Sequence, residues 1–249
     1  MNILLLNPNT TEAMTRRLHD VGQGVAAPGT LLTPATASKG VPYIATRAEA
    51  QIGGAIALEI LAEKHQDFDA AIIAAFGDPG LLGARELFDI PVVGMAEAAM
   101  LAACMLGRKF SIVTFARALE PWYRECVELN GLAGRCASIR MLDGSFRSVS
   151  DVQEEKEELL VELANRAVVE DEADVIILGG APLAGLAGKV KERLPVPLVD
   201  PVSAAVKQAE MLVTLAPRKA IAGTFRRPGA KPTKGLSEAL AKRIEHRTA

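Results

Sequence analysis

The side chains that most often carry metal or nucleophilic chemistry are few and scattered in this sequence. The three histidines, His19, His65 and His246, are isolated from one another. Cys126 and Cys136 lie ten residues apart with no histidine near them, which does not match the ligand spacing of a zinc site. Neither a Walker loop nor a Gly-x-Ser-x-Gly elbow occurs. We therefore expect no catalytic metal and no nucleotide cofactor.

A first candidate binding segment is the turn Asn7-Pro8-Asn9-Thr10-Thr11, which follows a short apolar run and opens a helical pattern. Backbone N–H groups at the start of a helix, together with side-chain amides and hydroxyls, suit a carboxylate or an imide-like anion. The same residues also fit a plain helix cap by Asn9, with Glu12 three residues further on. The two interpretations are compatible, so this turn is a candidate for ligand binding.

Two further turns repeat one another. Residues 69–81 read Asp-Ala-Ala-Ile-Ile-Ala-Ala-Phe-Gly-Asp-Pro-Gly-Leu, and residues 174–186 read Asp-Val-Ile-Ile-Leu-Gly-Gly-Ala-Pro-Leu-Ala-Gly-Leu, at a constant offset of 105. Each segment predicts a strand, a glycine-containing turn and a short helix. Ligands of open parallel sheets bind outside the carboxyl ends of the strands, so we expect the two turns to face one another across a shared cleft. The alternative is that both turns are only tight packing corners.

Other strand ends and one loop add to the candidates. Thr114 and Phe115 end a further predicted strand, and Tyr43 lies in a loop, residues 36–43, that we expect to reach over the cleft, although it could equally be a packing tyrosine. Asp78 is interpreted as a helix cap ahead of a proline, with a catalytic carboxylate as the alternative. The candidates for ligand binding are Asn7, Asn9, Thr10, Tyr43, Ala75, Phe76, Gly77, Thr114, Phe115, Gly180, Ala181 and Pro182.

The elements that would position these residues are short apolar strands alternating with longer amphipathic stretches, which is typical of an α/β fold with parallel sheets covered on both faces. The expected strands are residues 3–6, 70–75, 91–94, 110–114, 175–179 and 196–200. The repeat continues through a further strand to a last pair of matching segments, 108–115 and 218–225. We therefore predict two similar Rossmann-like lobes related by a pseudo-twofold axis, with the site between them. Lobe 1 would hold residues 1–96 plus about 206–249, and lobe 2 residues 97–205.

Composition excludes several classes of protein. The chain has 249 residues, a formal net charge of −2 and only 4% aromatic residues, which argues against a nucleic-acid partner. No segment approaches the roughly 18 consecutive apolar residues of a membrane span, and the N-terminus does not resemble a signal peptide. Three cysteines cannot form a closed disulfide framework. We expect a cytoplasmic protein with a small-molecule substrate and with neither a nucleic acid nor a membrane as partner.

The ordered set of motifs resembles the hydantoin/allantoin racemase family of the aspartate/glutamate racemase superfamily. The resemblance rests on the Asn7 turn, on the sequence Ala-Phe-Gly-Asp-Pro-Gly-Leu at 75–81, on Ile-Leu-Gly-Gly-Ala at 177–181, and on Asp-Pro-Val-Ser-Ala-Ala-Val-Lys-Gln-Ala-Glu at 200–210. It extends to about residue 225. It implies two Rossmann-like lobes with the site between them, no pyridoxal phosphate or other cofactor, and a homo-oligomer.

The sequence departs from that family at its catalytic positions. The resemblance implies two cysteines on opposite sides of the substrate carbon, one acting as base and the other as acid, at the ends of the two repeated strands. Ala75 and Gly180 stand at these positions, and neither side chain can carry a proton. Cys104, Cys126 and Cys136 are interpreted as packing residues. The catalytic residues are therefore unknown, and two-thiol racemisation is not supported.

Three hypotheses follow. The chain could be a racemase-like isomerase, or a cysteine-independent decarboxylase or lyase of the same superfamily, in which Asp78, Tyr43 or an activated water supplies the proton chemistry. It could be an inactivated racemase. It could also be a non-catalytic protein that binds a small anion. We favour the first, with a small carboxylate, amino acid, hydantoin or ureide as substrate, because the repeated turns keep their glycines and backbone donors.

Overall fold

The computed structural model describes residues 1–142 and 151–247, and their strands form two four-stranded parallel sheets. The first sheet has the order β2-β1-β3-β4 and the second the order β6-β5-β7-β8. The strands are β1 (Asn2–Asn7), β2 (Leu31–Thr36), β3 (Ala70–Ile73), β4 (Val92–Gly94), β5 (Phe110–Thr114), β6 (Cys136–Met141), β7 (Val175–Leu178) and β8 (Leu198–Val199). Because the order is the same in both sheets, the α/β fold of two similar halves is confirmed.

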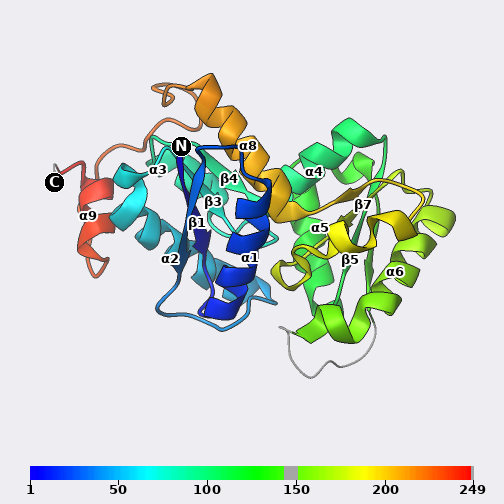
Figure 1. The fold of residues 1–249 in the computed structure, drawn as a ribbon. Coiled ribbons are helices and arrows are strands. Elements are labelled where there is room, and N and C mark those ends of the chain that lie inside the picture. The colour runs from blue at the N-terminus through cyan, green and yellow to red at the C-terminus, as the bar shows by residue number, and fades with distance from the viewer. Residues whose placement is uncertain (143–150, 248–249) are drawn as a thin grey trace.

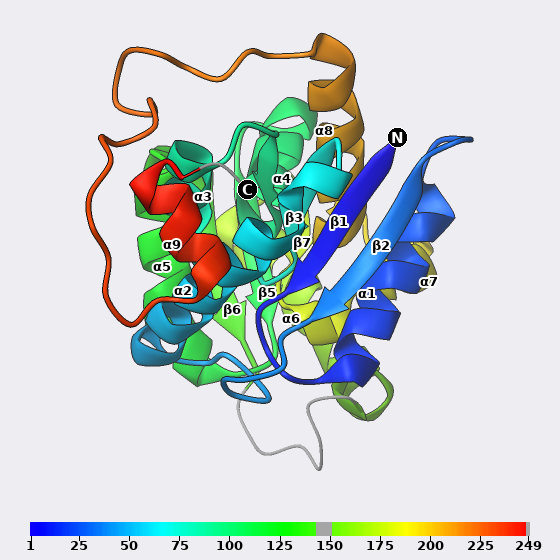
Figure 2. The ribbon, with the colours of Figure 1, turned by 90° about the vertical axis from the view of Figure 1, so that its left-hand side faces the viewer.

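Helices alternate with the strands throughout both halves. They are α1 (Glu12–Val25), α2 (Arg47–Lys64), α3 (Leu81–Leu87), α4 (Met95–Leu106), α5 (Glu120–Leu129), α6 (Val152–Asp171), α7 (Leu186–Val190), α8 (Pro201–Leu215) and α9 (Glu238–Glu245), with short 3-10 turns that include η5 (Ala181–Leu183). The two halves lie side by side, and α8 runs between them (Figure 1). Helix α9 packs on α2 at the outer end of the first half (Figures 1 and 2).

The inner strands form the core. All residues of β3, β5 and β7 are buried, and so are those of β1 after Asn2. Strands that are buried along their whole length lie in a sheet with helices on both faces, which is why their sequences are continuous apolar runs rather than alternating ones.

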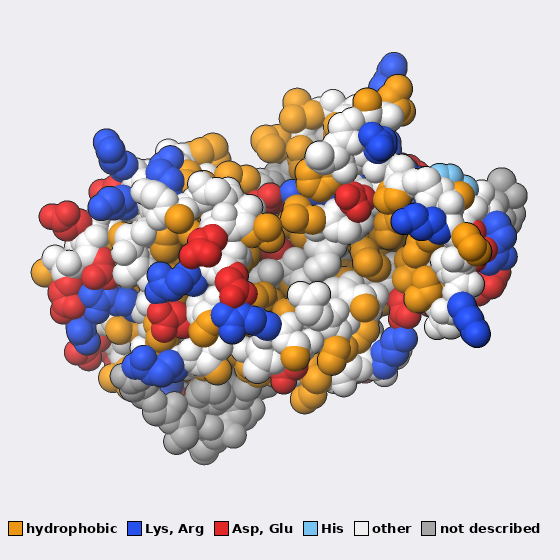
Figure 3. Space-filling view, turned by 180° about the vertical axis from the view of Figure 1, so that it is seen from behind, with side chains coloured by type: hydrophobic (Ala, Val, Ile, Leu, Met, Phe, Trp, Pro, Cys, Tyr) orange, Lys and Arg blue, Asp and Glu red, His pale blue; other side chains and the backbone are white. Residues whose placement is uncertain are grey.

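Among the described residues, no helix is long and apolar enough to cross a bilayer. On the face shown in Figure 3, the Lys and Arg side chains are mixed with Asp and Glu rather than gathered into one basic patch.

Two strands were missing from the sequence prediction. Strands β2 and β6 are each the outermost strand of their sheet next to β1 and β5. Strand β2 contains Pro34, and β6 contains Ser138 and Arg140, and both strands are only partly buried. Edge strands tolerate proline and polar side chains because one side of the strand makes no ladder hydrogen bonds, so their sequences lack the apolar runs of the inner strands.

The last part of the expected repeat was wrong. Residues 110–114 form β5, which holds in the second sheet the place that β1 holds in the first. Residues 218–225 form neither strand nor helix, and Ile221 is 94% exposed, so this segment has no buried face to add to a sheet. The repeating unit therefore begins two strands earlier than predicted, at β1 and β5 instead of β3 and β7. The expected lobe boundaries at 96/97 and 205/206 fall inside α4 and α8, and the division into those two lobes stays a prediction.

Candidate functional site

A cavity of about 240 Å³ lies where the two halves meet. This is a small volume for a ligand site, since such sites usually measure about 300–1,000 Å³. The lining comes from the β1–α1 turn, the loop between β2 and α2, helices α1 and α5, and the turns after β3 and β7. The lining residues are Asn9, Thr11, Met14, Pro42, Tyr43, Ile44, Ala75, Phe76, Trp122, Tyr123, Gly180, Ala181 and Pro182.

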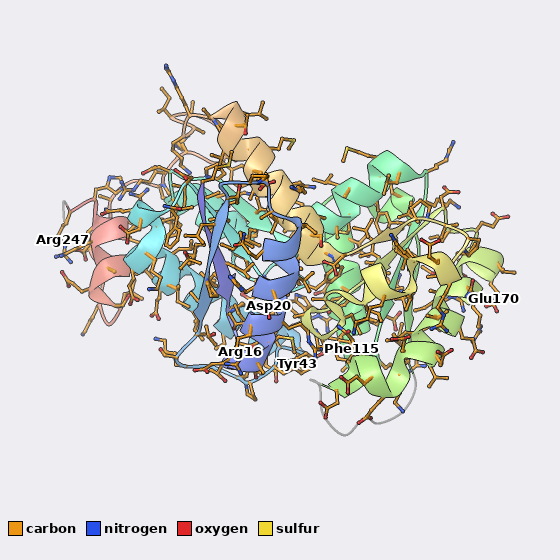
Figure 4. All side chains as sticks on the ribbon, viewed as in Figure 1. Arg16, Asp20, Tyr43, Phe115, Glu170 and Arg247 are labelled. Carbon is orange, nitrogen blue, oxygen red and sulfur yellow. The ribbon has the colours of Figure 1, made fainter. Side chains whose placement is uncertain are left out.

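Aromatic side chains from the two halves meet around this cavity. The rings of Tyr43 and Phe115 lie 5.9 Å apart between centroids, and those of Phe76 and Tyr123 lie 4.7 Å apart. Tyr43 and Phe115 lie next to one another at the junction of the halves (Figure 4). Phe76 also approaches the second repeated turn, since its Cε1 atom lies 3.3 Å from the place where a Cβ at Gly179 would be. The two repeated turns therefore contribute to one cavity.

The loop that carries Tyr43 is fixed to the β1–α1 turn by two hydrogen bonds. The backbone N–H of Thr10 donates to the carbonyl of Val41 at 3.0 Å, and the Thr11 hydroxyl donates to the carbonyl of Pro42 at 2.6 Å. The far end of the loop leads into the capping box that starts α2, in which Thr46 accepts a hydrogen bond from the Glu49 backbone N–H. Tyr43 thus belongs to a well-anchored wall of the cavity.

The expected ligand-binding role of the Asn7 turn stays a prediction, but three of its backbone donors make hydrogen bonds within the chain. The N–H groups of Asn9 and Thr11 donate to the side-chain oxygens of Asn7 and Asn9, and that of Thr10 donates to Val41. These three donors are already used within the chain, and Asn9 and Thr11 line the cavity. Asn9 does not occupy the N-cap position of α1 either, because the helix begins at Glu12 and Thr11 precedes it.

The repeated turns do offer free backbone donors. Hydrogen bonds from the backbone N–H groups of Ala75, Phe76, Gly180 and Ala181 are absent among the described residues. Two of these residues follow β3 and two follow β7, and all four line the cavity from opposite halves. Such paired N–H groups bind carbonyl or anionic oxygen atoms.

The polar side chains of the cavity include two tyrosines. Burial raises the pKa of Tyr43, and the nearby Glu49 carboxylate raises it further. Burial also raises the pKa of Tyr123. Both phenols are therefore neutral at pH 7 and act as hydrogen-bond donors and acceptors rather than as bases. The Tyr43 hydroxyl oxygen is buried and has no hydrogen-bond partner among the described residues.

Asp78 lies outside the cavity, and its carboxylate contacts the start of helix α4. Its two carboxylate oxygens accept hydrogen bonds from the backbone N–H groups of Ala96 and Glu97, each at 2.7 Å, at the start of α4. Burial raises its pKa to about 7 in spite of these two donors. The prediction that Asp78 caps the helix of its own turn was wrong, because that helix, α3, begins at Leu81 after Gly80. Asp78 caps the following long helix.

The cysteines are also absent from the lining. Cys126 is buried on α5 and lines a neighbouring groove, where burial raises the pKa of its thiol. Burial raises the pKa of Cys136 to about 11. Among the residues that the structure describes, the cavity is lined by no Lys, Arg, His, Asp, Glu or Cys side chain. Among the described residues, the side chains of the lining that could take part in proton transfer are therefore neutral hydroxyls.

The structure brings seven of the predicted site residues into the cavity: Asn9, Tyr43, Ala75, Phe76, Gly180, Ala181 and Pro182. Asn7 and Thr10 support the lining from behind, Gly77 lines the neighbouring groove, and Thr114 and Phe115 lie beneath the cavity wall. Thr11 belongs to the predicted turn but was not among the predicted site residues, and the sequence prediction missed Met14, Pro42, Ile44, Trp122 and Tyr123. The rarity of aromatic residues was a signal in the sequence, because the single tryptophan and both tyrosines of the chain line the cavity.

Comparisons with known proteins agree over nearly the whole chain. A family model described as Asp/Glu/Hydantoin racemase matches residues 3–209. A hydantoin racemase of Paenarthrobacter aurescens is 35% identical over 233 residues, which covers 93% of this chain and 99% of that protein. Allantoin racemase from Klebsiella pneumoniae superposes with a TM-score of 0.90 at 36% identity, covering 96% of this chain and 98% of that one. Allantoin racemase from Pseudomonas fluorescens superposes with a TM-score of 0.88 at 35% identity, covering 94% and 100%.

Proposed function

Because this chain belongs to the Asp/Glu/hydantoin racemase family, we propose that it binds a small hydantoin, ureide or carboxylate in the cavity between its halves and does not racemise it by a two-thiol route. The observation that carries the proposal is that Ala75 and Gly180, at corresponding places in the two repeated turns, line one cavity and lack an ionisable group.

The groups that line the cavity support ligand binding. It has free backbone donors on both sides, neutral tyrosine hydroxyls, and an apolar surface from residues such as Met14, Ile44 and Phe76. A small concave site with an apolar lining and a few converging polar groups is the usual form of a small-molecule site. The ligand's carbonyl oxygens would meet the N–H donors, and its substituent would contact the apolar wall.

The loss of two-thiol racemisation is supported by the chemistry of proton transfer. Inverting a stereocentre needs a base on one face of the carbon and an acid on the other, and positioned acid–base groups contribute a rate factor of about 10²–10⁴. Asp78 is engaged with α4, and a tyrosine whose pKa is raised is a poor base at neutral pH. These two facts weaken the hypothesis, favoured from the sequence, that Asp78 or Tyr43 replaces the thiols.

The chemistry that stays open is proton transfer through a bound water, with the hydroxyls and backbone N–H groups stabilising an enolate-like oxygen. It would make the chain a cofactor-independent decarboxylase or lyase acting on another substrate, rather than a hydantoin racemase. A cytoplasmic location, a homo-oligomeric state and the absence of a metal stay predictions.

The experiment that separates binding from racemisation uses the whole chain with enantiopure 5-benzylhydantoin in D₂O. Thermal unfolding with and without ligand reports binding, and ¹H NMR with polarimetry reports exchange of the ring C5–H and loss of rotation. The proposal predicts an increased Tm and an exchange rate equal to that of a protein-free control. Exchange with loss of rotation above that control would identify a racemase. Exchange with retained rotation would identify one-sided proton transfer.

A further inference from the structure

The side chains of Asn7 and Asn9 form one hydrogen-bonded unit where β1 ends. The Nδ2 group of Asn7 donates to Oδ1 of Asn9 at 3.0 Å and to the hydroxyl oxygen of Thr15 at 2.9 Å. Asn7 is fully buried and does not line the cavity, whereas Asn9 does. An effect of Asn7 on a ligand would therefore act through Asn9.

Backbone donors fix which way the two side-chain amides point. The Asn9 N–H donates to Oδ1 of Asn7 at 3.2 Å, and the Thr11 N–H donates to Oδ1 of Asn9 at 3.0 Å. Because a backbone N–H only donates, the atom that faces it in each side chain is the oxygen rather than the nitrogen. The Asn9 oxygen is therefore held by two donors, the Thr11 backbone and the Asn7 side chain.

This arrangement leaves the Nδ2 group of Asn9 as a free donor. The group makes no hydrogen bond among the described residues, and it is not shut off from solvent as the Tyr43 hydroxyl is. Of the other donors that Asn9 and Thr11 bring to the lining, both backbone N–H groups and the Thr11 hydroxyl bond within the chain. Asn9 therefore adds to the cavity an N–H donor of fixed orientation.

We propose that Asn7 is a positioning residue of this site, which holds the Asn9 amide with its oxygen turned away from the cavity so that the Asn9 Nδ2 group donates to an acceptor atom of the ligand. An amide is suited to this task because it accepts from the Asn9 backbone and donates to the Asn9 side chain, whereas an ionised carboxylate only accepts. The inference rests on the proposed function and adds a residue that acts on the ligand without touching it.

The test compares Asn7→Asp with a control, Thr15→Val, at pH 8, about four units above the ordinary pKa of an aspartate. The new carboxylate cannot donate to the Asn9 oxygen, so the Asn9 amide should turn its Nδ2 group towards the carboxylate and its oxygen towards the cavity. Thr15→Val removes the other acceptor of the Asn7 amide, which lies outside the lining, and keeps the bond to Asn9. Both variants lose a buried hydrogen bond and should lower the Tm, by about 3–8 °C.

The side-chain amide of Asn9 reports its own orientation without a ligand. The chain has five asparagines, so ¹⁵N labelling of asparagine gives a simple NMR spectrum of side-chain amides. In the wild-type chain and in Thr15→Val, the Nδ2 hydrogens of Asn9 should exchange with water at least about tenfold faster than those of Asn7, and in Asn7→Asp they should become protected. Exchange at Asn9 as slow as at Asn7 in the wild-type chain would overturn the orientation, whether or not the variants fold.

Calorimetry with 5-benzylhydantoin then reports the effect on binding. Asn7→Asp should weaken the affinity by about tenfold and Thr15→Val by less than about twofold. Equal affinity of Asn7→Asp and the wild-type chain, or an equal loss in the two variants, would overturn the positioning role and leave the proposed function intact. A wild-type chain that does not bind this probe would instead overturn the proposed function, and the role of Asn7 with it.

Discussion

Ala75 and Gly180 differ in what a cysteine side chain would meet at each position. Ala75 already has a Cβ in the cavity wall. Gly180 has a φ of +118°, a conformation that residues with a side chain rarely adopt. A Cβ there would also lie 2.7 Å from Phe115 Cε1. The backbone and the packing at position 180 thus suit glycine, and restoring a thiol there requires the turn to change shape.

We therefore expect the two single cysteine variants to behave differently. Ala75→Cys should unfold at a urea concentration close to that of the wild-type chain. Gly180→Cys should be less stable by about 1–3 kcal/mol because of backbone strain and the contact with Phe115. Equal stability of the two variants would show that the turn after β7 adapts freely.

Tyrosine ionisation gives a second prediction at this scale. The chain has two tyrosines, and burial raises the pKa of both. In the folded protein, tyrosinate absorbance at 295 nm should therefore not appear near pH 10, where an exposed phenol titrates. The folded state holds these protons more tightly than the unfolded state, so their contribution to stability is complete below about pH 10 and is lost as the pH rises further. A midpoint near pH 10 in the folded protein would contradict the burial of both hydroxyls.

The sequence predicted the turn residues of the site better than the helix residues. Ala75, Phe76, Gly180 and Ala181 could be identified because the repeat aligns the ends of two parallel strands, and strand ends of this kind form binding sites. Trp122 and Tyr123 could not, because they lie on α5, and which face of a helix meets a cavity depends on packing between elements far apart in the chain.

Helix α4 depends on Asp78 for its start. The carboxylate accepts two N–H groups from α4, and Gly94 leaves room for it, since a Cβ at Gly94 would lie 2.4 Å from the carboxyl carbon. The strand–turn segment that holds Ala75 is thereby joined to the helix that leads into the second half. This link between elements is a structural role for a residue that the sequence also suggested as a proton donor.

Replacing Asp78 should therefore change stability far more than ligand affinity. Asp78→Asn keeps the shape but leaves one acceptor oxygen for two donors, so we expect a loss of about 1–3 kcal/mol in unfolding free energy. The affinity for 5-benzylhydantoin should change by less than twofold, because the side chain lies outside the cavity. A large loss of affinity with unchanged stability would instead assign Asp78 to the site.

The anchoring of the Tyr43 loop gives a prediction with an internal control. The Thr11 side chain holds Pro42, whereas Thr10 holds Val41 through its backbone N–H. Thr11→Val should increase amide hydrogen exchange within residues 37–46 several-fold, because it removes a side-chain hydrogen bond. Thr10→Val keeps its backbone bond and should leave that exchange unchanged. Equal exchange in the two variants would show that the loop is held by other contacts.

At the scale of elements, the inner strands were predictable and the edge strands were not. Strands β3 and β7 are continuous apolar runs because helices cover both faces of each sheet, and such runs stand out in a sequence. Strand β2 is interrupted by Pro34, and its pairing with β1 is set by tertiary position rather than by its own composition. The segment 218–225 resembles the sequence of β5 and its neighbours at 108–115, but it pairs with no strand among the described residues.

Across the whole molecule, contacts between the halves surround the cavity. Arg17 of α1 donates to the carbonyl of Pro182 at 2.9 Å, and Arg47 of α2 pairs with Glu125 of α5. Together with the aromatic pairs, these contacts join elements of the first half to elements of the second. The shape of the cavity therefore depends on how the two halves are arranged. The internal repeat was the feature of the sequence that predicted this arrangement.

Whether the family's cavity is kept while racemisation is lost is tested most directly by following enantiopure 5-benzylhydantoin in D₂O with the wild-type chain. We expect the ligand to raise the Tm while the C5–H signal and the optical rotation decay no faster than without protein. Loss of rotation together with deuterium incorporation above the protein-free rate would contradict it.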